Sequence, residues 1–204
     1  MGKVIFSNSI SLDGFVAGPN DNPDNGLGDG GARLFEWYMN GNTELPLPGT
    51  DMVFRPSRAS AEMLQQEWSN VGAMVAGRRM FDIARAWGGN PPGGENCFIV
   101  THNPPQEWVK PGSPFIFVTD GVESAVRQAK QAAGDKNVGI SSASIAQQCL
   151  KAGLLDEIQI DLVPVLLGGG VRLFENLGTT LPELELMRVV EGLGVTHLKY
   201  RVVR

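Results

Sequence analysis

Short apolar runs alternate with amphipathic segments through the middle of the chain. The runs have the length and composition of buried strands, and they lie at 73–77, 97–101, 115–118 and 138–140. Segments with apolar residues at helical spacing accompany them, at 57–70, 78–86, 122–133 and 145–155. Strands that alternate with helices predict a parallel sheet covered by helices.

Both ends of the chain follow a different pattern. Residues 3–12 have the composition of a first strand, which the Asp-Gly turn pair at 13–14 ends. Residues 157–165 alternate apolar and polar side chains, and two more strands follow at 184–190 and 195–203 with a Gly-Leu-Gly turn between them. The sequence therefore predicts a mostly parallel sheet with an antiparallel C-terminal hairpin.

The segment 20–56 interrupts this order. It is dominated by Gly, Pro, Asn and Asp, with one apolar-aromatic stretch at 34–39 that favours a helix. Loops of this length in compact domains are usually functional or mobile. We find no internal repeat and no linker between two halves, so we expect one domain over 1–204 with 20–56 as a loop-rich insertion.

The composition narrows the class of protein. A chain of 204 residues with 42% hydrophobic residues can build one sizeable core. The formal charge of -5, from 17 basic and 22 acidic residues, disfavours binding to nucleic acid. Cys97 and Cys149 are too few for a disulfide framework, which suits a reducing compartment. The sequence has no signal core and no apolar stretch of about 18 residues, so we expect a cytoplasmic protein that does not bind membranes.

Several familiar motifs are absent or fail on their context. Residues 26–31 contain the spacing G-x-G-x-x-G, but no strand precedes them, which disfavours a Rossmann interpretation. The same stretch fails as a calcium loop, because Pro23 and Ala32 occupy ligand positions. No Ser-His-Asp order, Cys-His pair, Walker motif or metal-ligand spacing occurs in the sequence. We therefore expect neither a hydrolase nor a metal site.

Polar side chains follow three of the predicted strands at their carboxyl ends, where open α/β sheets bind ligands. Residues 77–81 (GRRMF) place two arginines at a helix start, which suits a phosphate but also an ordinary solvated helix. Residues 101–103 (THN) offer a histidine to a cofactor, although a lone loop histidine is more often a surface residue. Residues 141–144 (SSAS) would form either a phosphate cradle or a plain N-cap.

Three other positions give weaker signals. Residues 164–170 (PVLLGGG) end the alternating strand in glycines, which indicates close backbone approach or a flexible turn. Asp13 is the best-placed isolated carboxylate, although its turn explains it equally well. His197 lies inside the last strand, and we interpret it as structural.

Taken in order, four segments resemble the reductase domain of bacterial riboflavin biosynthesis, the C-terminal domain of the bifunctional deaminase-reductase. They are 11–14 (SLDG), 77–81 (GRRMF), 141–145 (SSASI) and 152–170 (AGLLDE through PVLLGGG), and together they span nearly the whole chain. The Leu-Asp-Glu strand that leads to Pro-Val-Leu-Leu-Gly is the most specific of them. The resemblance implies a dihydrofolate-reductase-like fold, a three-layer α/β sandwich, with NADPH as cofactor and usually a homodimer.

The resemblance also assigns roles to residues. Gly77, Arg78 and Arg79 would hold the 2′-phosphate, Thr101 and His102 would border the adenine, and the serine turn would receive the pyrophosphate. The residues assigned to the cofactor are Ser9, Val16, Gly77, Arg78, Arg79, Met80, Thr101, His102, Asn103, Ser141, Ser142, Ala143, Ser144 and Ile145.

The resemblance assigns fewer residues to the substrate than to the cofactor. Asp13 is the expected catalytic group, orienting the substrate, and Leu167 and Gly168 would close the same pocket. Phe15, Trp37 and Trp87 are candidate pocket walls, although large aromatic side chains more often belong to a core. No residue matches the carboxylate that anchors the pterin in dihydrofolate reductases, and Glu36 is a weak candidate.

The implied activity is hydride transfer from NADPH to a C=N or C=O group of a small heterocycle that is pterin-, pyrimidine- or riboflavin-precursor-like. Two departures qualify it. Ser141-Ser142 replaces the usual Gly-Gly pair, and serine disfavours positive φ. No deaminase domain accompanies the reductase, and the 20–56 insertion is added, which argues against the riboflavin intermediate as substrate. The alternative is a non-catalytic nucleotide- or small-ligand-binding protein of the same fold.

Overall fold

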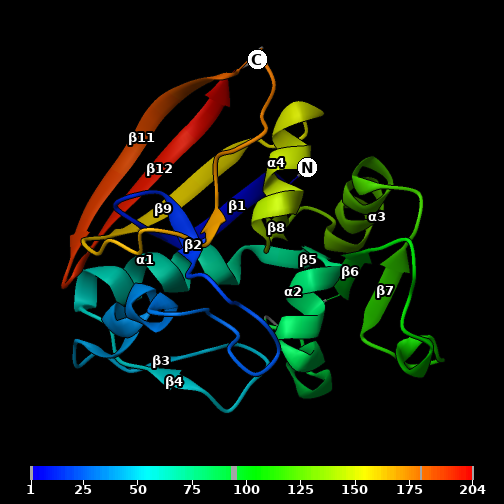
Figure 1. The fold of residues 1–204 in the computed structure, drawn as a ribbon, viewed down its shortest axis with the longest axis horizontal. Coiled ribbons are helices and arrows are strands. Elements are labelled where there is room, and N and C mark those ends of the chain that lie inside the picture. Colours follow the sequence, from blue (N-terminus) through cyan, green and yellow to red (C-terminus); the bar gives the residue numbers. More distant parts are fainter. Residues whose placement is uncertain (1, 93–95, 180, 204) are drawn as a thin grey trace.

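The computed structural model describes residues 2–92, 96–179 and 181–203. Its centre is an eight-stranded sheet in the order β11-β12-β9-β1-β8-β5-β6-β7. The strands are β1 (Val4–Ser11), β5 (Val71–Gly77), β6 (Asn96–Val100), β7 (Phe115–Val118), β8 (Asn137–Ile140), β9 (Glu157–Val163), β11 (Glu183–Gly192) and β12 (Val195–Val203). All pairs from β9 to β7 are parallel, whereas β12 pairs antiparallel with both β9 and β11. This confirms the predicted mostly parallel sheet with an antiparallel C-terminal hairpin (Figure 1).

Helices cover both faces of the sheet, as expected for a three-layer sandwich. They are α1 (Arg58–Ser69), α2 (Arg78–Ile83), α3 (Val122–Ala133) and α4 (Ala143–Lys151). On one face α3 and α4 pack against alternate apolar residues of the central strands, including Val4, Phe6, Ile158 and Ile160. On the other face α1 lies over buried polar residues such as Gln159 and His197, whereas α2 packs on a small apolar cluster that includes Phe81 and Phe115. The main core therefore lies under α3 and α4, and the α1 face is left for a site.

The insertion at 20–56 folds onto the α1 face, beside α1 and α2 (Figure 1). It contains two 3-10 turns, η1 (Gly31–Leu34) and η2 (Glu36–Met39), and a small hairpin of β3 (Leu45–Pro46) and β4 (Val53–Phe54). The helix favoured over 34–39 is thus two short turns rather than one α-helix. A second core of side chains from these turns and α1 fastens the insertion, with Leu34, Trp37 and Leu64 buried.

The helix predicted over 78–86 ends earlier than its pattern indicates. After Ile83 the chain enters a left-handed turn, η3 (Arg85–Gly89), in which Arg85, Ala86 and Trp87 have φ of 48°, 51° and 47°. Non-glycine residues rarely adopt this conformation, and packing holds them there. Ala86 is buried and the Trp87 ring stacks on Phe115. Periodicity cannot reveal such a turn, because its apolar residues are spaced as in a helix.

The remaining elements are short. The segment after β1 forms β2 (Phe15–Ala17), which pairs antiparallel with β10 (Val171–Arg172). A further 3-10 turn, η4 (Gln106–Trp108), lies between β6 and β7. In the part of the chain that the structure describes, no helix is long and apolar enough to cross a membrane.

Candidate functional site

A cavity of about 1220 Å³ opens on the α1 face of the sheet. Its floor is formed by β1, β8 and β9, and its walls by α1, α2, the first turn of α4 and the insertion. Ser7, near the middle of the central strand β1, is exposed, because no side chain of the opposite layer covers it. The cavity thus reaches the middle of the sheet and is large enough for two flat ligands side by side.

The serine turn lies at one end of this cavity and leaves the start of α4 open. The Ser142 hydroxyl accepts a hydrogen bond from the Gly77 amide at 3.1 Å, so it does not cap its own helix. The first amides of α4 are therefore unpaired by any cap, which is the arrangement that binds phosphate at helix N-termini. Neither Ser141 nor Ser142 has positive φ, and Ser142 is extended at φ -165°. Serine therefore fits this turn without strain.

The two arginines of the GRRMF segment are held in different ways. Arg79 lines the cavity and forms an ion pair of 2.6 Å with Asp21 of the insertion. Arg78 lies just outside it, where its guanidinium binds Asp82 at 2.7 Å and the carbonyl of Asn103. The Arg78 contact joins the start of α2 to the turn after β6. Both guanidinium groups keep donors that a phosphate would need.

The predicted site residues are only partly gathered around the cavity. Those that line it are Val16, Arg79, Met80, Trp87, Ser141, Ser142, Ala143 and Ser144. Those that lie outside its wall are Ser9, Asp13, Phe15, Trp37, Gly77, Arg78, Thr101, His102, Asn103, Ile145, Leu167 and Gly168. His102 is exposed, and Gly77 is buried beneath Ser142.

Asp13 binds the turn that follows β9, far from it in the sequence. Its carboxylate accepts hydrogen bonds from the amides of Leu167 and Gly168, at 3.2 and 2.7 Å. A hydrogen bond from Ser11 and these amides lower the pKa of Asp13 to about 2. The carboxylate therefore fastens the glycine-rich turn 168–170 to the end of β1.

The three candidate aromatic walls differ in position. Trp87 lines the cavity from the left-handed turn. Trp37 is fully buried, with its indole N–H donating to the Ser9 hydroxyl at 3.0 Å. Phe15 is buried under the guanidinium of Arg172, which lies 4.4 Å from the ring centroid. The aromatic residues that line the insertion side are instead Phe35, Tyr38, Phe54 and Trp68.

A polar floor lies beneath α1, and no motif in the sequence indicated it. In register across three strands, Ser7, Gln159 and Lys199 form one row, and Ser9, Asp161 and His197 form the next. Asp161, Gln159 and His197 are each 1% exposed. The alternation of 157–163 carried the signal, because its polar positions face the cavity side while its apolar positions face α3 and α4. From the sequence, the same alternation indicated only a strand.

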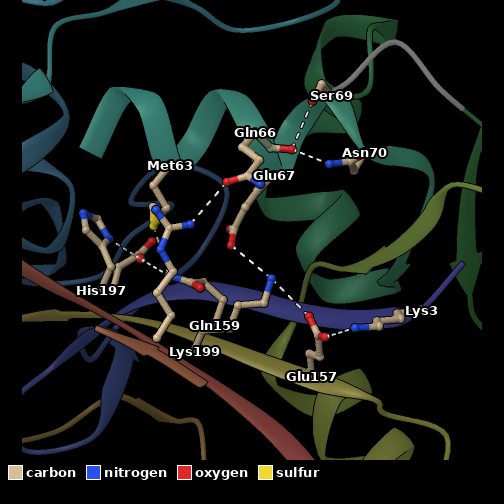
Figure 2. Close-up of polar contacts among 12 residues, drawn as sticks. Lys3, Met63, Gln66, Glu67, Ser69, Asn70, Glu157, Gln159, His197 and Lys199 are labelled. Atoms are coloured by element: carbon tan, nitrogen blue, oxygen red, sulfur yellow. Dashed lines mark hydrogen bonds and ion pairs between the residues drawn. The ribbon is translucent and has the colours of Figure 1, made fainter. Parts of the chain in front are cut away.

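A chain of charges runs along the floor (Figure 2). Lys199 lies between Glu67 of α1, at 3.3 Å, and Glu157 of β9, at 3.1 Å, and Glu157 also pairs with Lys3. Burial alone would raise the pKa of Glu157, but hydrogen bonds and charges from Lys3 and Lys199 hold that pKa below its usual value. Burial raises the pKa of Glu67. Burial would lower the pKa of Lys199, yet the two carboxylates raise it.

Comparison with known proteins identifies the family of the chain. A sequence profile described as the RibD C-terminal domain matches residues 2–197. A search of curated proteins found no match.

Solved structures share the fold at low sequence identity. A structure described as a riboflavin biosynthesis protein, from Shewanella sp. PV-4, is 20% identical, with a TM-score of 0.70 and complete coverage of both chains. A pyrimidine reductase-like protein from Corynebacterium diphtheriae is 14% identical, with a TM-score of 0.62 and coverage of 100% and 92%. Dihydrofolate reductase from Enterococcus faecalis, complexed with NADP(H), is 12% identical, with a TM-score of 0.57 and coverage of 98% and 96%. These likenesses confirm the dihydrofolate-reductase-like fold.

Proposed function

This chain belongs to the RibD C-terminal domain family, and from that premise we propose that it is a reductase that uses NADPH to reduce a C=N or C=O group of a small heterocycle. The observation that carries the proposal is the cavity that joins the open α4 N-terminus to a polar floor. A dinucleotide and a flat acceptor would lie side by side there, which is the geometry that hydride transfer requires.

The residues at the cofactor end fit NADPH. The uncapped amides of α4 and the hydroxyls of Ser141 and Ser144 suit a pyrophosphate. Arg78 lies between the start of α2 and the turn at 101–103, where its guanidinium suits the 2′-phosphate. When bound, NADPH would supply the hydride, and the protein would supply position, charge and exclusion of water. The absence of strain in the serine turn removes the reason for preferring a non-catalytic binding role.

A thermal-shift titration with NADPH and NADH tests the cofactor. A ligand that binds only the folded state raises the melting temperature, by an amount that grows with its concentration relative to Kd. We expect a larger shift with NADPH than with NADH. The Arg78→Met variant should lose the difference, and Arg58→Met, which removes an exposed ion pair of α1 that does not line the cavity, should keep it. No shift with either nucleotide at millimolar concentration would contradict the proposal.

We also propose a homodimer formed through β11. This strand lies at the edge of the sheet, is ten residues long, and exposes Leu184, Leu186 and Val189 at 46 to 54%. A long apolar edge strand is prone to pair with another strand. Pairing with the β11 of a second copy about a two-fold axis would satisfy both edges at once.

We place the protein in the cytoplasm. Cys97 and Cys149 are both buried free thiols, and burial raises the pKa of each to about 12. Such thiols are inert core residues, and they need no oxidising compartment. An activity assay on separated cell fractions tests this placement.

A further inference from the structure

A row of aromatic side chains lines the insertion side of the cavity. Phe35 and Tyr38 come from the segment 31–39, Phe54 from β4 and Trp68 from α1. The ring centroids lie 6.3 Å apart for Phe35 and Tyr38, 4.6 Å for Tyr38 and Phe54, and 6.1 Å for Phe54 and Trp68. Aromatic rings bind other rings through offset stacking and edge contacts. Because the row is longer than one six-membered ring, a fused ring system would contact more of it.

Other apolar side chains extend this aromatic row. The cavity lining on the insertion side also includes Met39, Leu47, Met52 and Leu64. Met39 and Met52 are 56% and 55% exposed, so much of their surface is in contact with water. A ligand that covered them would remove apolar surface from water, which is favourable, and methionine adapts readily to the shape of a ligand. The insertion side of the cavity therefore suits a planar and largely apolar ligand.

The charges of the floor and of its α1 side balance one another. Three basic and three acidic side chains line this part of the cavity, namely Lys3, Arg188, Lys199, Glu67, Glu157 and Asp161. Both lysines pair with carboxylates (Figure 2), and Arg188 hydrogen-bonds to Gln66 at 3.3 Å. Among the described residues, the other basic side chain in the lining is Arg79, at the α2 end. A phosphate on the floor would add unbalanced negative charge, which is costly away from water.

Two polar groups on the lining are left for a ligand. Oδ1 of Asp161 is hydrogen-bonded to His197 and Gln159, whereas its Oδ2 has no hydrogen bond to any described residue. The Tyr38 hydroxyl likewise has none within the described part of the chain. Since no buried polar side-chain atom of the described residues lacks a partner, both oxygens are open to the cavity that these two residues line.

The two groups are neighbours and have complementary roles. The Tyr38 ring stacks on Trp37 with 3.8 Å between centroids, and Trp37 packs edge-on at 5.0 Å against His197, the partner of Asp161. Burial raises the pKa of Tyr38, and the negative charges of Asp161 and Glu67 raise it further, so its hydroxyl keeps the proton and can donate. A carboxyl oxygen accepts. A donor beside an acceptor matches the N–H and the adjacent carbonyl of a lactam ring.

We propose that the substrate is a fused-ring heteroaromatic lactam without a phosphate group, which stacks on the aromatic row, donates its N–H to Asp161 and accepts at its carbonyl from Tyr38. This inference rests on the proposed function, and it names the substrate class of the same cavity. Asp161 and Tyr38 determine specificity here by binding the ring edge. The α4 end of the cavity stays free for the cofactor, because the aromatic row lies on the insertion side.

Fluorescence titration with four flavins, in millimolar NADP⁺ to fill the α4 end, tests each part of the proposal. Lumiflavin is a fused-ring lactam without sugar or phosphate, and 3-methyllumiflavin differs from it only by a methyl group on the lactam nitrogen. Riboflavin and riboflavin 5′-phosphate differ only by the phosphate. We expect lumiflavin to bind with a Kd below about 100 µM. The methyl group should weaken binding about tenfold, because the hydrogen bond to a carboxylate is lost. The phosphate should also weaken binding about tenfold, because it finds no unpaired cation.

Two variants assign these contacts to residues. Asp161→Asn should weaken lumiflavin about tenfold but 3-methyllumiflavin less than about twofold, because the methylated ring has no N–H for this side chain. Tyr38→Phe removes only a hydroxyl, and it should weaken both probes equally, by about three- to tenfold, because both keep the carbonyl. The matched control is Tyr200→Phe, which should change neither affinity. Tyr200 is the other of the two tyrosines in the chain, packs against the main core and does not line the cavity.

Three results would each overturn the proposal: no binding of lumiflavin at about 100 µM, equal binding of the two lumiflavins, or binding of the 5′-phosphate within about threefold of riboflavin. Thermal unfolding of each variant shows whether the fold persists. If Asp161→Asn does not fold, the ratio of the two lumiflavins in the wild type and the Tyr38→Phe result still decide. NADPH binding without lumiflavin binding would reject this substrate class and leave the proposed function standing. Lumiflavin binding without any NADPH binding would reject the proposed reductase and leave the ligand class of the cavity.

Discussion

Lys199 is the residue whose removal should expose the energetics of the cavity floor most clearly. It is 20% exposed and lies between two carboxylates, of which Glu157 is 4% and Glu67 17% exposed. Lys199→Met keeps the length of the side chain but leaves both carboxylates without their shared cation. Breaking a buried pair in this way costs about 3–5 kcal/mol. Lys3 still neutralises Glu157, so we expect a loss of about 2–3 kcal/mol in the free energy of unfolding.

The loss should depend on pH with a definite sign. In the wild type, the lowered pKa of Glu157 gives stability that is present above its unfolded pKa and lost as pH falls through the folded value. Without Lys199, the folded pKa of both carboxylates rises, so each destabilises the variant once pH exceeds its unfolded pKa. The variant should therefore lose more stability at pH 8 than at pH 5, where protonation relieves the repulsion.

Urea unfolding at pH 5 and pH 8, followed by tryptophan fluorescence, measures both effects. A drop of 2–3 kcal/mol corresponds to a decrease in Tm of about 4–12 °C for a chain of this size. Arg58→Met is the matched control, since it breaks an exposed pair with Glu62 on the same helix and should leave the urea midpoint nearly unchanged. A loss below about 1 kcal/mol, or one equal at the two pH values, would refute the reasoning.

Three further outcomes are expected. Arg78→Met should weaken NADPH binding by about 10- to 100-fold, which is the usual contribution of charge-assisted hydrogen bonds, and should weaken NADH binding by much less. Titration of nucleotide fluorescence measures both affinities. If the proposed dimer forms through β11, light scattering after gel filtration should find wild type as a dimer and Leu186→Lys as a monomer, with the Tm lowered by a few degrees at most. Because the pKa of Asp13 is about 2, the stability from its hydrogen bond to the Gly168 amide is fully present above the unfolded pKa and is lost only as pH falls through about 2. Hydrogen exchange at pH 4 should therefore find the Gly168 amide protected. The Asp13→Asn variant should lose that protection.

The parts of the fold that periodicity determines were predictable. Strands such as β5 and β9, and helices such as α3, follow from apolar residues whose spacing has only one good packing solution. The left-handed turn at 85–89 was not predictable, because tertiary packing of Ala86 and Trp87 overrides the helical pattern. The stretch 34–39, which the sequence favoured as a helix, instead falls in two 3-10 turns for a similar reason, since Trp37 is buried against Ser9 rather than along a helix face.

The candidate site, like the fold, has one part that the sequence indicated and one part that it did not. Local motifs indicated the α4 end of the cavity, because a helix N-terminus and its serine turn are contiguous in sequence and 141–144 line the cavity. The polar floor depends instead on residues 36 positions apart, Asp161 and His197, and on Ser60 a further 101 positions away from Asp161. Their proximity follows from strand register and from how α1 packs, which no local pattern in one sequence reveals.

His197 shows what this difference means for function. Its position inside a strand suggested a structural residue, and an isolated buried histidine would be one. Its Nδ1 and Nε2 nevertheless bind different partners, a cavity-facing carboxylate and a hydroxyl that leads to a helix cap. A merely structural polar residue needs its hydrogen bonds satisfied, and an apolar side chain of similar volume often serves as well. A histidine at this position instead joins the cavity floor to the helix that covers it, because its two ring nitrogens bind groups on both.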